Sequence, residues 1–384
     1  MSAIASFFMP VVSLLGEGCV KELPDRVKSL KATKPLLITD KGMTALGYSQ
    51  KIVQLLEDAG FNCVVFDETV PNPTDENVVA GAKVYQDNHC DMLISLGGGS
   101  AHDCCKAVGI IVTNGGVISD YEGLDQVVQA LPPYVAINTT AGTASEMTRF
   151  TIITNTSNHV KMAIVDWRVT PDVAINDPVL MIDMPPALTA ATGMDALTHA
   201  VEAYVSTAAN PITDACALQA IQLIGTNLRK AVARGDDLEA RDAMAYAQYL
   251  AGMAFNNASL GYVHAMSHQL GGMYNLPHGV CNALLLPHVC EVNMIARLER
   301  FADIAVALGE NIEGLSMRDA AKLAIKSIRA LSKDVGIPKN LTELGVKKKD
   351  IEEMVKNAQK DVCALTNPRK LTDEEVAAVY RSAL

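Results

Sequence analysis

The stretch at residues 91–100, DMLISLGGGS, is an apolar run that opens into a loop of three glycines and a serine. Two apolar runs of the same kind precede it, PLLITD at 35–40 and NCVVFD at 62–67. Each of these two is followed by a segment whose apolar residues have helical spacing, at 48–60 and 74–88. Short strands that alternate with helices are typical of a parallel sheet covered on both faces. The stretch and its surroundings therefore predict an α/β domain that begins with βαβαβ order.

More short apolar runs extend the β pattern toward the C-terminus. They are YVAIN (134–138), RFTIIT (149–154), VKMAIV (160–165) and DVAIN (172–176). Because no long helical segment separates the later runs, we expect some of them to pair antiparallel.

The first 18 residues are apolar and carry no charge before Glu17. A signal peptide is one interpretation, but the stretch has no Lys/Arg-containing start and Pro10 interrupts it. We therefore expect a pair of short strands at the edge of the domain.

After about Asp183 the pattern is helical to the end of the chain, and Thr372 with Glu375 forms a capping box before the final helix. We predict two domains, an α/β domain over residues 1–182 and an all-α domain over residues 183–384. Ligands gather in clefts between domains, so we expect the reactive groups of the helical domain to face the sheet.

The composition limits the kinds of partner that the chain is expected to bind. A net charge of −11 argues against nucleic acid and anionic membrane surfaces. The nine cysteines form no CxxC pair, which is typical of a reduced, cytoplasmic protein. No segment reaches the ~18 consecutive apolar residues of a membrane span. We expect a cytoplasmic protein that binds neither nucleic acid nor a membrane.

The helical half contains five candidate metal ligands. Asp195 and His199 are four residues apart, as are His264 and His268, so each pair shares one face of a helix. His278 follows an Asn-Leu-Pro break in the helical pattern, and we expect it on a loop. One carboxylate with several imidazoles suits Fe(II) or Zn(II), and the lack of a thiolate argues against a structural zinc site. Five groups at this spacing favour a metal site over buried core histidines.

Polar groups follow several predicted strands, and each has two interpretations. The loop Gly97–Ser100 suits either a pyrophosphate, bound by backbone N–H groups at a helix N-terminus, or a tight turn. Asp40 at a strand end either accepts from ribose hydroxyls and repels a 2′-phosphate, or caps a helix. Asn72 has the same ambiguity. The loop 138–143 either closes over a dinucleotide or is an ordinary Thr/Gly-rich turn, and Lys161 pairs either with a ribose or phosphate oxygen or with solvent.

The segment GYVHAMSHQLGGMYNLPHGVCNALLLPHV (261–289) is close to the metal-site signature of the group III "iron-containing" alcohol dehydrogenases. The chain resembles this family over essentially its whole length. It resembles the bacterial ethanol-active branch most, and the lactaldehyde/1,2-propanediol reductase branch somewhat less. The resemblance implies the dehydroquinate synthase-like fold of iron alcohol dehydrogenases, with an NAD-binding α/β domain, a metal-binding helical domain and a homodimer.

The resemblance also implies roles for particular residues. Fe(II), with Zn(II) as the alternative, would be held by Asp195, His199, His264 and His278. His268 would lie beside the nicotinamide and would not be a stable ligand, which spacing alone cannot decide. The NAD cleft would be lined by Asp40, Asn72, Gly97, Gly98, Gly99, Ser100, Asp103, Thr139, Thr140, Thr143, Thr148, Lys161 and Leu180. The chain departs from the family at Ala101, where relatives usually carry a proline that pre-sets the helix start.

The resulting hypothesis is NAD-dependent, metal-assisted oxidation of small primary alcohols such as ethanol and reduction of the aldehydes, with His268 relaying the proton to water. One alternative is a zinc polyol dehydrogenase of the same fold that acts on glycerol or 1,2-propanediol. Others are a non-redox enzyme of the dehydroquinate synthase-like fold and a non-catalytic metal-binding or assembly protein. The remaining histidines are interpreted as structural, namely His89, His102, His159 and His288.

Overall fold

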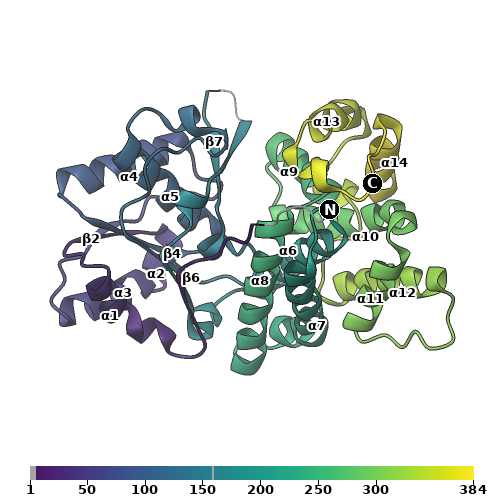
Figure 1. The fold of residues 1–384 in the computed structure, drawn as a ribbon, viewed down its shortest axis with the longest axis horizontal. Coiled ribbons are helices and arrows are strands. Elements are labelled where there is room, and N and C mark those ends of the chain that lie inside the picture. The colour runs from purple at the N-terminus through teal and green to yellow at the C-terminus, as the bar shows by residue number, and fades with distance from the viewer. Residues whose placement is uncertain (1–5, 158–159) are drawn as a thin grey trace. The chain divides into compact units, whose positions relative to one another are not determined.

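The computed structural model describes residues 6–157 and 160–384 (Figure 1). The chain forms two compact units. One comprises Phe8–Thr140 and Ala144–Met181, and the other comprises mainly Ile182–Leu384 together with Ala141–Thr143.

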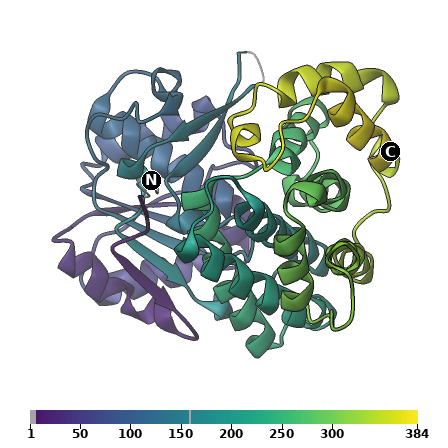
Figure 2. The same cartoon turned by 45° about the vertical axis from the view of Figure 1, so that its right-hand side comes forward.

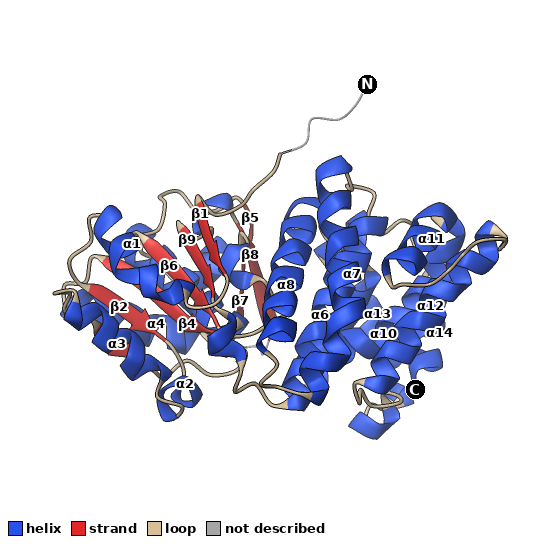
Figure 3. Cartoon of the chain, turned by 90° about the horizontal axis from the view of Figure 1, so that it is seen from below, coloured by secondary structure: helices blue, strands red, loops and turns tan. Residues whose placement is uncertain are grey.

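The first unit is built on a parallel sheet in the order β1-β9-β6-β4-β2-β3 (Figure 3). Its strands are β1 Val12–Leu15, β2 Pro35–Ile38, β3 Val64–Phe66, β4 Met92–Gly97, β6 Tyr134–Asn138 and β9 Val173–Asn176. A smaller sheet has the order β5-β8-β7, with β5 Gly123–Leu124, β7 Phe150–Asn155 and β8 Val160–Val165. Its β7 and β8 are antiparallel, as expected for runs without a helix between them. The helices are α1 Leu23–Ser29, α2 Lys41–Ala45, α3 Tyr48–Asp58, α4 Asp75–Asp87 and α5 Gly99–Asn114.

Alternation along the strands divides the core of this unit between the two faces of the large sheet. Leu36 and Ile38 on β2 lie in a cluster with residues of α4 and α5, whereas Leu37 lies in a cluster with residues of α1 and α3. Helices therefore cover both faces, which explains why the strands are continuous apolar runs. Gly81 on α4 allows close packing, because a Cβ there would lie 2.7 Å from a methyl carbon of Val108 on α5.

The strands and helices predicted from residue 35 to residue 176 are confirmed. The predicted pair of N-terminal strands is wrong for the described residues from 6 onward, because this stretch contributes a single strand, β1, which pairs with β9. Pro10 has no N–H to donate and Gly16 and Gly18 have positive φ, so the extended segment between them is short. Residues 1–5 of this prediction lie outside the described residues.

The second unit is helical (Figure 2). Its helices are α6 Pro186–Val205, α7 Pro211–Ala233, α8 Leu238–Ala258, α9 Tyr262–Tyr274, α10 His278–Asn293, α11 Leu298–Ala307, α12 Met317–Asp334, α13 Ile351–Ala358 and α14 Asp373–Ala383. Short 3₁₀ turns across both units span Cys19–Glu22, Ile118–Tyr121, Ser145–Met147, Trp167–Val169, Pro178–Met181, Met294–Ala296, Thr342–Leu344, Lys348–Asp350 and Val362–Thr366. The predicted capping box is confirmed, since Thr372 accepts from the N–H of Glu375 and Glu375 accepts from the N–H of Thr372.

One helical stretch, His278–Ala296, has the length and composition of a membrane-crossing helix. Of its most apolar window, 61% is buried inside the fold, as in core helices of globular proteins that pass the same test. The stretch also carries Asn282, His288 and Glu291, so it is not an unbroken apolar run.

Candidate metal centre and cofactor loops

Helix α6 carries two of the predicted ligands and a further carboxylate on one face. Asp195, His199 and Glu202 follow each other at i, i+4 and i+7, and their exposed fractions are 2%, 4% and 3%. The helix starts at Pro186, where a proline fits because the first N–H groups of a helix have no partner within it. Nearly all of α6 is buried, so the fold places these polar side chains in its interior.

Helices α9 and α10 bring the remaining candidates to the same place. His264 lies in the first turn of α9, and Asn275, with φ 53°, follows the last residue of that helix as its C-cap. Pro277 then precedes a new helix, α10, whose first residue is His278. The prediction that His278 lies on a loop is therefore wrong. The proline that ends one helical pattern also suits the start of the next, because its missing N–H needs no partner there.

The four groups that the resemblance assigns to the metal lie together. One ligand atom from each of Asp195, His199, His264 and His278 is within 4.8 Å of all the others. The Oδ1 atom of Asp195 is 4.0 Å from Nε2 of His199, 4.0 Å from Nε2 of His264 and 3.7 Å from Nε2 of His278. The rings of His199 and His264 stack at a centroid distance of 4.7 Å. One carboxylate and three imidazoles at this spacing suit a divalent cation such as Fe(II) or Zn(II).

Asn282 shows which atoms of this cluster are electron-pair donors. Its side-chain nitrogen lies 2.6 Å from Oδ1 of Asp195, 3.0 Å from Nε2 of His264 and 3.1 Å from Nε2 of His278. A carboxylate oxygen only accepts hydrogen bonds, so the atom facing it is the amide nitrogen, which only donates. The amide has two N–H bonds, so besides the Asp195 carboxylate it donates to one imidazole, and the nearer acceptor is Nε2 of His264. A carboxylate oxygen and imidazole nitrogens that converge in a buried site are what a cation requires, and the residues fit the predicted metal.

Glu202 holds the far side of His264, a contact that the sequence prediction missed. Its Oε2 atom lies 2.6 Å from Nδ1 of His264, and its Oε1 atom accepts from the N–H of Val263 at 2.7 Å. Burial raises the pKa of Glu202 to about 8, and burial lowers the pKa of His264 well below its usual value. Both shifts reflect the cost of charge in a buried site, and a cation at the cluster would favour the charged form of Glu202 and the neutral form of His264.

Gly279 permits α10 to reach the cluster. A Cβ at this position would lie 2.3 Å from the carbonyl oxygen of Ala191 and 3.3 Å from the Cβ of Asp195. Only a residue without a side chain lets the start of α10, with His278, come this close to the backbone of α6.

We expect Gly279→Ala to weaken metal binding about fivefold or more, because the added methyl group forces α10 and His278 away from α6. Overpacking of this kind costs roughly 1–3 kcal/mol, and 1.4 kcal/mol corresponds to a factor of ten. Competition with a coloured chelator measures the affinity. Gly272→Ala on α9 is the matched control, since a Cβ there would have no atom within 4 Å. Parent affinity in Gly279→Ala would show that this close approach is not needed.

His268 lies one turn after His264 and has a different partner. Its Nδ1 atom is 2.7 Å from Oδ2 of Asp361, and its ring stacks on that of His278 at a centroid distance of 5.5 Å. Burial acts to raise the pKa of Asp361, but the charge and hydrogen bond of His268 outweigh it and bring the pKa to about 2. His268 thus lies beside the four-group cluster with Nδ1 engaged, so Nε2 is the nitrogen left for proton transfer. Asp361 was not predicted.

The glycine loop, Asp40 and Thr140 lie side by side in the α/β unit. Gly97 ends β4, and a Cβ on it would lie 3.6 Å from Oδ2 of Asp40. A Cβ on Gly98 would lie 2.9 Å from the methyl carbon of Thr140. Asp40 also caps α2, since its Oδ1 accepts from the N–H groups of Gly42 and Met43. The two interpretations of Asp40 are therefore compatible, because one oxygen caps the helix and the other faces the glycine loop.

Asp103 on α5 contacts the loop that carries Thr148. Asp103 accepts from the hydroxyl of Ser145 at 2.7 Å, and burial raises its pKa to about 6 against the opposing charge of Lys106. Lys106, which is fully buried, donates to the carbonyl oxygens of Ser145, Thr148 and Phe150 at 2.7, 2.9 and 2.7 Å. This buried ammonium group, absent from the prediction, holds the loop that the resemblance places along the cofactor.

The other predicted cofactor residues fall in several places. Lys161 donates to the side-chain oxygen of Asn72 at 2.9 Å, so these two predicted residues contact each other. Thr139 follows β6 and is buried, and Leu180 is buried in the turn Pro178–Met181. Thr143 belongs to the short segment that clusters with the helical unit. Gly99 and Ser100 form the first residues of α5.

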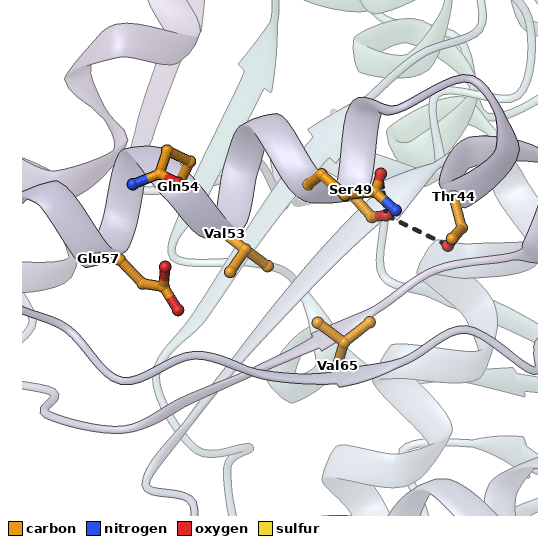
Figure 4. A pocket seen from close by; sticks show the side chains of 7 residues that line it. Thr44, Ser49, Val53, Gln54, Glu57 and Val65 are labelled. Atoms are coloured by element: carbon orange, nitrogen blue, oxygen red, sulfur yellow. Dashed lines mark hydrogen bonds between the residues drawn. The ribbon is translucent and has the colours of Figure 1, made fainter.

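The α/β unit also has an open hollow of 420 Å³ beside α3 and β3 (Figure 4). Within it the hydroxyl of Ser49 donates to that of Thr44 at 3.2 Å. The hollow is lined by Thr44, Ser49, Gln50, Val53, Gln54, Glu57 and Val65. None of the predicted NAD or metal residues is among them, so we assign this hollow no role in the predicted site.

Two of the histidines interpreted as structural have a hydrogen-bond partner on Nδ1. His102 is fully buried with Nδ1 2.7 Å from the hydroxyl of Ser95, and burial lowers its pKa to about 3. Nδ1 of His288 lies 2.9 Å from the hydroxyl of Ser382. His89 is exposed in the turn after α4. His159 lies outside the described residues.

Comparisons with known proteins cover both units. Residues 10–178 match the family model of iron-containing alcohol dehydrogenase, and residues 189–384 match the C-terminal model of the Fe-containing alcohol dehydrogenase family. The 1,3-propanediol dehydrogenase of Citrobacter freundii is 54% identical over 379 residues, 98% of each chain. The NAD-dependent methanol dehydrogenase of Bacillus methanolicus is 49% identical over 381 residues, 99% of this chain and 100% of that one. A crystal structure of 1,3-propanediol oxidoreductase has a TM-score of 0.98 at 53% identity and covers 100% of both chains.

The chain has an α/β unit with a parallel sheet and a helical unit. The helical unit contains a buried cluster of one carboxylate and three imidazoles. These features define a class of two-unit proteins that can hold a metal ion. The chain belongs to the iron-containing alcohol dehydrogenase family, a family of oxidoreductases that uses NAD and iron. The predicted family and fold are thereby confirmed, while the assignment to its ethanol-active branch stays a prediction.

Proposed function

We propose that the chain catalyses NAD-dependent oxidation of small primary alcohols, with ethanol and 1,3-propanediol as the leading candidates, and reduction of the corresponding aldehydes. The observation that carries the proposal is the convergence of Asp195 Oδ1 and the Nε2 atoms of His264 and His278 on one point, marked by the amide nitrogen of Asn282. The family match favours a redox reaction over the non-redox alternative. The name of the Citrobacter freundii relative supports 1,3-propanediol, whereas the polyols suggested by the sequence were 1,2-propanediol and glycerol.

Three sets of residues have separate roles in the proposed reaction. A divalent cation held by Asp195, His199, His264 and His278 supplies Lewis acidity, which lowers the pKa of an alcohol and polarises an aldehyde carbonyl. His268, oriented through Nδ1 by Asp361, accepts the alcohol proton and passes it to water. The glycine loop with Asp40 and Thr140 binds the pyrophosphate and ribose of NAD.

A substrate panel tests the proposal. The protein, loaded with Fe(II) under anaerobic conditions, is mixed with NAD and ethanol, 1,3-propanediol, 1,2-propanediol or glycerol, and absorbance at 340 nm is followed. We expect the highest kcat/KM for a primary alcohol among the first two. A higher value for glycerol or 1,2-propanediol would favour the polyol alternative, and no absorbance change with any of them would exclude an NAD-dependent alcohol dehydrogenase.

The choice of metal follows from a parallel measurement. The donor set accepts Fe(II) and Zn(II), and we propose Fe(II) on the strength of the family. Metal analysis of anaerobically purified protein, with activity after reconstitution by each metal, distinguishes the two ions.

We also propose that the active protein is a cytoplasmic homodimer whose partner is a small alcohol or aldehyde, without nucleic acid or a membrane. The acidic net charge supports the last two exclusions. Sedimentation equilibrium would show the oligomeric state directly.

Asp40 should control the choice between NAD and NADP. We expect Asp40→Gly to raise the ratio of kcat/KM for NADP to that for NAD, because it removes a carboxylate that accepts from ribose hydroxyls and repels a 2′-phosphate. Asp40→Asn is the matched variant, since asparagine caps α2 as well as aspartate but carries no charge. If both variants keep the parent ratio, Asp40 acts only as a helix cap.

A further inference from the structure

We propose that Glu202 is the positioning residue of the metal centre, because its carboxylate keeps the proton of His264 on Nδ1 and so leaves Nε2 available to the metal. The inference rests on the proposed function and concerns a residue that no ligand motif marks. It follows from two sets of contacts on opposite edges of one imidazole ring.

The first set fixes the state of Nε2. The amide nitrogen of Asn282 lies 3.0 Å from Nε2 of His264 and 2.6 Å from Oδ1 of Asp195. Because that nitrogen is a donor, Nε2 of His264 accepts and carries no proton. In a neutral imidazole the proton must then be on Nδ1.

The second set supplies the partner for that proton. Nδ1 of His264 lies 2.6 Å from Oε2 of Glu202, and both side chains are almost completely buried. The geometry therefore assigns Nδ1–H as donor and the carboxylate as acceptor. A carboxylate behind a ligating imidazole fixes the tautomer and the orientation of the ring, and it makes the ring a stronger ligand.

The orientation of Glu202 itself is fixed by the start of α9. Its Oε1 atom accepts from the N–H of Val263 at 2.7 Å, at the helix end where N–H groups lack partners within the helix. Gly261 makes room for this contact, since a Cβ on it would lie 2.7 Å from the same Oε1 atom. One carboxylate thus both caps α9 and orients the histidine in the first turn of that helix.

The variant Glu202→Gln separates the two roles. If the amide oxygen of glutamine replaces Oε1 toward Val263, its NH₂ group donates to Nδ1 of His264 and pushes the ring proton onto Nε2. If the amide is turned over, its NH₂ group meets the N–H of Val263 and the cap is lost. In the first orientation the hydrogen bond that favours a bare Nε2 is lost, and in the second the contact that fixes the side chain on α9 is lost, so we expect metal affinity to fall about 10- to 100-fold, the range for groups behind metal ligands.

Asp361→Asn is the matched control. It makes the same change from acid to amide behind His268, one turn further along α9. We expect this variant to keep the metal affinity of the parent. An equal loss in both variants would mean that any acid-to-amide change near α9 disturbs the centre, and would overturn the role of Glu202.

The experiment titrates Zn(II) against a coloured chelator for the parent and for Glu202→Gln, Asp361→Asn and Asp195→Ala, with the unfolding temperature of each metal-free protein as a fold control. Zn(II) is diamagnetic, so nitrogen–proton NMR of the loaded parent also reports the tautomer of His264, even if Glu202→Gln does not fold. The expected result is a proton on Nδ1 in the parent and weakened binding in Glu202→Gln. Parent affinity in Glu202→Gln, or a proton on Nε2 in the loaded parent, overturns the inference alone. Unimpaired binding by Asp195→Ala would instead overturn the proposed metal site.

Discussion

Replacing Asp195 or His264 by alanine should abolish metal binding and alcohol turnover while NAD still binds. The two residues come from different helices, and each presents a lone pair to the same buried point. Without Asp195 the site loses its only anionic ligand, and without His264 it loses one of three imidazoles. The residues predicted to contact NAD, apart from Thr143, belong to the α/β unit and are not changed.

Metal content by elemental analysis, turnover at 340 nm and NAD binding by calorimetry are measured on the same preparation. Asp303→Asn serves as the control, because it alters a carboxylate of the same unit that binds the hydroxyl of Tyr204 and not the cluster. Full metal content and rate in either alanine variant would show that the cation binds elsewhere.

His268→Ala should lower alcohol oxidation about 100-fold or more while metal content stays near that of the parent. His268 lies outside the four-group cluster, and its Nδ1 is engaged by Asp361. Its removal leaves all four proposed ligands but breaks the route of the alcohol proton to water. General acid–base groups contribute roughly 10²–10⁴-fold, unless water substitutes.

The loss of alcohol oxidation rate in His268→Ala, relative to the parent, should become smaller as pH rises, because hydroxide can then take the proton directly. Metal analysis and a pH–rate profile decide the matter, with His288→Ala as a control in which Ser382 loses its partner far along α10. Loss of metal in parallel with rate would make His268 a ligand. A rate profile identical to that of the parent would remove it from proton transfer.

The sequence predicted the strands well because each one is a continuous apolar run with glycine or polar residues at its end. β4, which ends in Gly97, is the clearest case. The prediction of two N-terminal strands was wrong because apolar character alone does not determine whether one strand or two will form. The prediction for His278 was wrong for a related reason, since Pro277 breaks the helical pattern in the sequence but is the N-cap of α10 in the structure.

The candidate site was predictable where its residues share a helix. Asp195 with His199 is such a pair, and by the same spacing Glu202 at i+7 and Asn282, four residues after His278, were within reach. The partner of His268 was not, because Asp361 lies 93 residues further along the chain and only the packed fold brings them together. The role of Lys106 could not be predicted either. Its partners are backbone carbonyl oxygens, which every residue type has, so the sequence does not show which ones it contacts.

The proposed ligands come from three separate helices, α6, α9 and α10, and this origin couples metal loading to folding. The unfolded chain holds no such set of ligands, so every increment of free metal above the dissociation constant stabilises the native state relative to the unfolded state. At a free concentration 100 times that constant the gain is about 2.7 kcal/mol. The supply of metal would thereby lengthen the lifetime of the protein as well as support its activity, because metal-free molecules open more often and are degraded sooner.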